Sequence, residues 1–112
     1  MITLKQGDIF PDITATVLNE NDVVVDVTGA TITCSCRSSR DPTTRILDGS
    51  TGVVVDGPTG RVAYQWDSGE SDVEPGSYEA EFKVVPPSGE AYRVPTSGYI
   101  TVIVESRIGS TA

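Results

Sequence analysis

The chain has 112 residues, which suits a single domain with its own hydrophobic core. Its 16 acidic residues against 8 basic ones give a formal net charge of −8, which argues against nucleic-acid binding, because that affinity comes from Lys and Arg at phosphates. No apolar run approaches the roughly 18 residues of a membrane span. Since the first residues, MITLKQGDIF, lack the layout of a signal peptide, we expect synthesis in a cytoplasm without export by a leader.

Short runs rich in β-branched and aromatic residues recur along the chain, separated by Gly, Pro, Asn and Asp. With no segment of helical period, this spacing is typical of an all-β sandwich or barrel. In chain order we predict strands at Ile2–Gln6, Asp12–Leu18, Val23–Val27, Ala30–Arg37, Arg45–Leu47, Val53–Val55, Arg61–Trp66, Gly76–Val85, Ala91–Val94 and Gly98–Glu105. Residues 1–105 are expected to form the domain and 106–112 a flexible C-terminal tail.

The pair of strands at Arg61–Trp66 and Gly76–Val85 is expected to organise the core. Large apolar residues alternate there with polar ones, so they share one face of each strand. Each aromatic ring can bury about 150–250 Å². The predicted core is Val62, Tyr64, Trp66, Tyr78, Ala80, Phe82, Ile100, Val102 and Val104.

A second pattern lies where the later of these strands begins. Asp72, Gly76 and Tyr78 form a D-x-x-x-G-x-Y arrangement. Immunoglobulin-like sandwiches place a tyrosine corner at this point, with the Tyr hydroxyl bonded to upstream backbone. The alternative is a Tyr that only begins a strand.

Cys34 and Cys36 are expected on one face of a strand. Successive positions on one face lie about 6.5–7 Å apart, at or beyond the reach of a disulfide. The chain has no His and no other Cys, so a zinc site is not expected. We predict two buried, reduced thiols that bind no metal.

Several classes of enzyme chemistry lack their residues. Without His, a Ser-His-Asp or Cys-His arrangement cannot form, and no phosphate-binding glycine loop is present. Paired carboxylates remain possible, but abundance of acids alone is weak evidence. We predict no enzymatic activity and no cofactor.

Two charged stretches are candidate interaction sites. The acidic one is the segment Asp67–Glu81, which could form a calcium loop or a solvated acidic edge. Its six acids are Asp67, Glu70, Asp72, Glu74, Glu79 and Glu81, of which the first four are the candidate contact residues. The basic one holds Arg37, Arg40 and Arg45, which could contact an acidic partner or simply face solvent. The strands at Ile2–Gln6 and Val23–Val27 are the expected sheet edges, where a neighbour could add a strand.

Five stretches occur in a familiar order: KQGD at Lys5–Asp8, VVDVTGA at Val24–Ala30, GRVAYQW at Gly60–Trp66, PGSYEAEFKV at Pro75–Val84 and SGYITVIV at Ser97–Val104. Together they resemble the immunoglobulin-like domain at the N-terminus of phage baseplate upper proteins, over about residues 4 to 105. The resemblance implies an Ig-like antiparallel β-sandwich of about seven to nine strands, without catalytic residues, built into a virion by protein–protein contacts.

The resemblance also shapes the expected function. A free-standing copy of such a domain suggests a small decoration or connector protein of the phage head or tail, made in the host cytoplasm. It would be held in many copies, in a symmetric assembly, by other phage structural proteins and by neither nucleic acid nor membrane. The alternative is a baseplate component, or a host-surface or carbohydrate-binding module. Tyr92 and Tyr99 would favour a carbohydrate site if both proved solvent-facing and adjacent.

Overall fold

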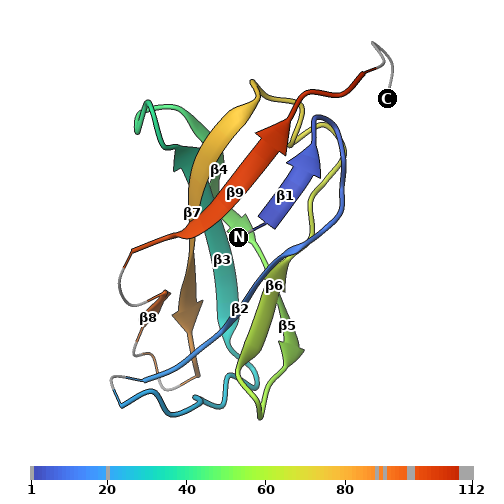
Figure 1. Ribbon diagram of the computed structural model, residues 1–112. Coiled ribbons are helices and arrows are strands. Elements are labelled where there is room, and N and C mark those ends of the chain that lie inside the picture. Colours follow the sequence, from blue (N-terminus) through green and yellow to red (C-terminus); the bar gives the residue numbers. More distant parts are fainter. Residues whose placement is uncertain (1, 20, 88, 90, 96–97, 109–112) are drawn as a thin grey trace.

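The computed structural model describes residues 2–108 apart from 20, 88, 90, 96 and 97. The described residues form nine strands and no helix (Figure 1). The strands are β1 (Ile2–Lys5), β2 (Ile13–Thr16), β3 (Thr31–Ser38), β4 (Arg45–Thr51), β5 (Val53–Asp56), β6 (Arg61–Tyr64), β7 (Gly76–Val85), β8 (Tyr92–Val94) and β9 (Ile100–Glu105). Within these residues there is accordingly no helix long and apolar enough to cross a membrane.

The strands form two sheets. A six-stranded sheet has the order β1-β9-β7-β3-β4, with β8 also paired to β7, and a three-stranded sheet has the order β2-β6-β5. In an Ig domain, strands B, E and D share one sheet and C, F and G the other, and here β2, β6, β5 and β3, β7, β9 take those places. The predicted all-β sandwich is confirmed, with one parallel pair, β1 with β9, at its edge.

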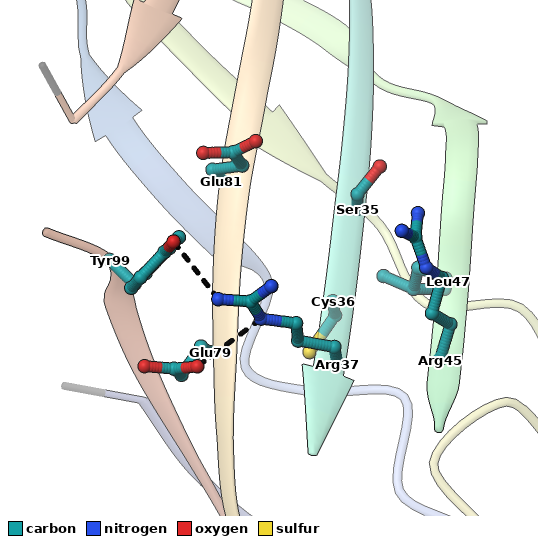
Figure 2. A pocket seen from close by; sticks show the side chains of 8 residues that line it. All are labelled: Ser35, Cys36, Arg37, Arg45, Leu47, Glu79, Glu81 and Tyr99. Atoms are coloured by element: carbon teal, nitrogen blue, oxygen red, sulfur yellow. Dashed lines mark hydrogen bonds and ion pairs between the residues drawn. The ribbon is translucent and has the colours of Figure 1, made fainter. Parts of the chain in front are cut away.

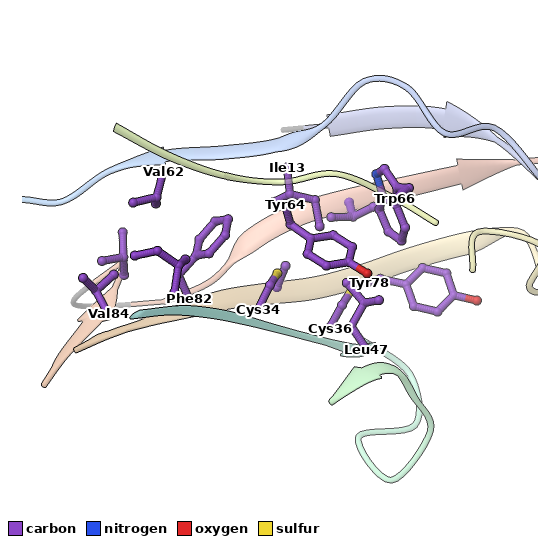
Figure 3. Close-up of a cluster of buried hydrophobic side chains, with 14 of the residues drawn as sticks. Ile13, Cys34, Cys36, Leu47, Val62, Tyr64, Trp66, Tyr78, Phe82 and Val84 are labelled. Atoms are coloured by element: carbon purple, nitrogen blue, oxygen red, sulfur yellow. The ribbon is translucent and has the colours of Figure 1, made fainter. Parts of the chain in front are cut away.

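The core lies between the two sheets and follows the predicted alternation (Figure 3). Every predicted core residue is buried except Ile100, which is partly buried and packs against the others. Trp66 lies two residues after the end of β6 and meets the Tyr64 ring edge-on, with 5.9 Å between ring centroids. Cys34 and Cys36 point into this core from β3 as free thiols, as predicted.

The predicted strand and sheet edge at Val23–Val27 is wrong. Only Val24 forms an isolated bridge, with Leu18. The segment instead crosses one end of the sandwich, because the Val25 amide bonds to the Val17 carbonyl and the Val27 amide to the Gly57 carbonyl, each at 2.9 Å. The other expected edge is confirmed, since β1 is the outermost strand of the six-stranded sheet.

The strand predicted at Arg45–Leu47 proves longer, because β4 continues through Asp48 and Gly49. Gly49 has φ +68°, a conformation that costs a glycine little, and the pairing of β4 with β3 shifts register near this point. A turn residue thus makes a β-bulge here and does not end the strand.

Of the predicted tail, residues 106–108 are described and 109–112 lie outside the described residues. Arg107 lies against the domain: its guanidinium is 3.5 Å from an Asp72 carboxylate oxygen and 3.5 Å from the Gln6 carbonyl. The first residues after β9 are therefore attached to the loop between β6 and β7.

Candidate functional site

The predicted basic site divides between the outer face of the six-stranded sheet and the loops at one end of the sandwich. Arg37 on β3 lies opposite Arg45 on β4 and opposite Glu79 on β7. Arg40 lies outside this row, in the loop between β3 and β4. The structure therefore brings together two of the three predicted arginines.

Arg37 is the most constrained of these side chains (Figure 2). Its Nε lies 3.3 Å from a Glu79 carboxylate oxygen, and its Nη2 donates to the Tyr99 hydroxyl at 2.9 Å. The guanidinium carbon is 4.9 Å from the centroid of the Tyr99 ring, within range of a cation–π interaction. One carboxylate and one aromatic ring thus hold the Arg37 head group on the sheet.

A shallow hollow of about 90 Å³ surrounds this arginine. The bulge in β4 borders it, where the Gly49 amide donates to the Ser35 hydroxyl at 3.0 Å. Its charged lining residues are Arg37, Arg45, Glu79 and Glu81, all of which already have partners, because Arg45 pairs with Asp48 and Glu81 with Arg93. The hollow is consequently close to neutral and presents no concentrated charge to a ligand.

Arg40 occupies a different environment. No described residue forms an ion pair with it. It lines a groove of about 430 Å³ between its own loop and the loop before β7, with Ile46, Val73 and Glu74 among the other lining residues. Of the predicted arginines, Arg40 is the one placed to meet a partner with its charge uncompensated.

The predicted acidic site is the loop between β6 and β7, and its carboxylates differ in whether they bond within the chain or face solvent. The Glu70 carboxylate accepts from the Tyr64 hydroxyl at 2.6 Å and from the Asp67 amide at 2.7 Å. Asp72 pairs with Arg107. The Asp67 and Glu74 side chains are exposed. Glu70 thus fastens the loop to the core, while Asp67 and Glu74 are the carboxylates it presents to solvent.

The tyrosine corner is confirmed in this loop. The Tyr78 hydroxyl donates to the Glu74 carbonyl at 2.6 Å, four residues upstream, as in an Ig domain. The calcium-loop alternative gains no support, because no three Asp, Glu, His or Cys side chains converge in the described part of the chain.

Burial also changes the acidity of several groups. It raises the pKa of Tyr64 far above its ordinary value, and the adjacent Glu70 carboxylate adds to the effect. Burial raises the pKa of the Cys34 and Cys36 thiols to about 12. These thiols stay protonated at neutral pH and are poor nucleophiles.

Tyr92 and Tyr99 do not form a joint aromatic platform. Tyr92 pairs with buried Val84 and packs against the core, whereas Tyr99 is exposed and contacts Arg37 on the outer face. The two rings therefore lie on opposite faces of the six-stranded sheet, and the condition for a carbohydrate site is not met.

Sequence reasoning missed the outward residues of the three-stranded sheet, Val53, Val55 and Arg61. A run of three valines at residues 53–55 has no polar alternation to show which members face solvent. Arg61 lies within a predicted strand. The small number of charges around it depends on which strands pair with that strand, and this cannot be read from the sequence.

A search of protein-family models found no match, and no curated protein matches the chain.

Proposed function

We propose that the protein is a non-enzymatic structural component of a phage virion, a small Ig-like decoration or connector protein of the head or tail. The observation that carries the proposal is the coincidence of the motif order with the fold. Three of the five stretches that resemble the Ig-like domain of baseplate upper proteins coincide with elements of the sandwich: Gly60–Trp66 with β6, Pro75–Val84 with the tyrosine corner and β7, and Ser97–Val104 with β9.

The surface supports a role in protein–protein contacts. A groove of about 430 Å³ runs between Arg40 and Glu74, which carry opposite charges, and its lining also includes the apolar residues Ile46 and Val73. Exposed ion pairs contribute only about 0–1 kcal/mol each, so these charges would set the orientation of a partner more than its affinity. The partners in this proposal are other phage structural proteins, in a symmetric assembly with many copies.

Quantitative mass spectrometry of purified virions of the encoding phage tests the proposal. The protein should be present at a fixed ratio to the major capsid protein. A ratio near one indicates decoration of the head, and a much lower fixed ratio indicates a connector, tail or baseplate position. Absence from purified virions, with the protein abundant in infected cells, would contradict the proposal.

A charge-reversal series tests which residues are involved. We expect Arg40→Glu to reduce incorporation into particles at low salt, because its charge is uncompensated within the described chain. Arg45→Glu is the matched control, since Arg45 already pairs with Asp48. Equal incorporation of both folded variants and the wild type would remove Arg40 from the interface.

A further inference from the structure

The outer face of the three-stranded sheet exposes apolar side chains on a regular strand. Val53 and Val55 on β5 are 40% and 56% exposed, and Thr14 and Thr16 on β2, on the other side of β6, are exposed as well. Antiparallel sheets that face water normally alternate apolar residues inside with polar residues outside. Here two of the three exposed residues of β5 are valines, as at a protein–protein contact.

This face is also nearly free of charge in a chain at −8. Asp56 is the one acid, and Arg61 the one base, within the three strands β2, β5 and β6. The two residues are register partners, yet no ion pair joins them, and no other described residue pairs with either. The face therefore carries one positive and one negative group, side by side and both uncompensated.

A hollow of about 280 Å³ lies on the same face, lined by Thr14, Thr16, Val55 and Arg61 together with Ala15 and Val62. Val62 is buried in the core and Ala15 packs against the core, so both side chains point inward beneath the hollow. The exposed Val55 side chain lines the hollow and also projects from the face toward solvent. Such a face can receive an aliphatic side chain of a partner.

We propose that this face is the contact between two copies of the chain, packed about a two-fold axis with Arg61 of each copy against Asp56 of the other. A two-fold contact uses one patch twice, so it suits a patch that carries its own opposite charges. Most acids lie between the strands, which makes end-to-end packing repulsive and leaves the sheet faces as the places where copies can approach.

Because this contact joins two copies of the same chain, it should form in the purified protein without a phage particle. The inference deepens the proposed many-copy assembly, but the two fail separately. A protein that is monomeric in solution and present in virions would overturn this inference alone. A dimer that is absent from virions would overturn the proposed function alone.

Sedimentation equilibrium over a concentration series to the millimolar range is the test. Wild type should dimerise, and Val55→Glu should raise the dissociation constant at least about tenfold, because it places two carboxylates in an apolar contact. Ile103→Glu is the matched control: it adds the same charge to a half-buried residue of β9 in the other sheet. A monomeric wild type, or equal weakening by both folded variants, would overturn the proposal.

A charge exchange tests the pairing itself. Arg61→Asp alone and Asp56→Arg alone should each lose dimerisation, because each places like charges together across the two-fold axis. An equimolar mixture of the two variants should dimerise again, since every contact then joins Arg to Asp. If the mixture remains monomeric while both variants are folded by circular dichroism, the proposed pairing is wrong.

Discussion

The outer faces of the two sheets differ in whether their charged side chains are paired within the chain. Within the strands of the six-stranded sheet, every acid has a basic partner: the pairs are Lys5–Glu105, Arg37–Glu79, Arg45–Asp48 and Arg93–Glu81. The strands of the three-stranded sheet contain one acid and one base, which are not paired. The first face is polar and neutralised within the chain, and the second is apolar with its charges still available.

The difference matters because the ion pairs are exposed. Pairs of this kind contribute about 0–1 kcal/mol each, too little to hold the sandwich together. Their effect is to prevent carboxylates on adjacent strands from repelling one another and from binding other cations. The face of the six-stranded sheet, whose carboxylates are paired within the chain, is suited to contact with solvent. On the face of the three-stranded sheet, Arg61 and Asp56 are unpaired within the described chain and can still form ion pairs with a partner.

The largest expected effect removes the core that supports both faces. Trp66→Ala should cost about 3–5 kcal/mol of unfolding free energy, because the ring is 4% exposed, packs on Tyr64 and donates to the Pro11 carbonyl at 3.1 Å. A small domain has only about 5–15 kcal/mol in all. Urea denaturation measures the loss. Phe10→Ala is the control, since Phe10 is 69% exposed and should change stability by less than about 0.5 kcal/mol.

Alkaline pH should weaken the six-stranded side of the core. In the unfolded chain a thiol ionises near pH 8.5, whereas folding raises the pKa of Cys34 and Cys36 to about 12. The folded state then holds more protons, so stability is complete below about pH 8.5 and falls as pH rises toward 12. Between pH 9 and 10.5 we expect a loss of roughly 2 kcal/mol per thiol.

The matched variant for this pH dependence is Cys34→Ala, which removes one titrating thiol and leaves Cys36. Urea midpoints at pH 8 and 10.5 should fall less in the variant than in the wild type. An equal fall in both proteins would assign the alkaline loss to other groups, Tyr64 foremost, because its pKa is raised in the same direction.

A smaller effect is expected at the loop that joins the two sheets. Tyr78→Phe removes the hydroxyl bond to Glu74 between β6 and β7 and leaves the Glu74 carbonyl without that donor. We expect a cost of about 1–2 kcal/mol in thermal or urea unfolding. Tyr99→Phe, which loses an exposed hydroxyl contact to Arg37, should cost less than Tyr78→Phe. The reverse order would mean that the corner does not secure the loop.

The smallest effect separates the two faces directly. Arg37→Gln should cost up to about 1 kcal/mol at low salt, because it removes a pair with Glu79 and the contact with the Tyr99 ring. Arg61→Gln removes the same charge from the other face, where no described residue pairs with it, and should change monomer stability by less than about 0.5 kcal/mol. High salt should narrow the difference in urea unfolding, and a difference unaffected by salt would contradict an electrostatic origin.

The alternation of apolar and polar residues was sufficient to predict a strand and its buried residues where one face of the strand is buried and the other is exposed to solvent. The predicted bounds Gly76–Val85 are those of β7, and its inward residues Tyr78, Ala80, Phe82 and Val84 are all buried. The tyrosine corner could also be predicted, because a Gly and a Tyr at fixed spacing act within one loop. Burial of the two thiols followed from their shared face on β3.

The tertiary structure alone decided which surfaces are unpartnered. At residues 53–55, three valines carry no alternation, so only pairing with β6 shows that Val54 faces inward and its neighbours outward. Val23–Val27 resembles a strand by composition but finds no continuous neighbour to pair with. Arg37 and Tyr99 meet across 62 positions of sequence. Alternation is a local property that the sequence by itself determines, whereas pairing and charge neutralisation join distant residues and exist only once the sheets have formed.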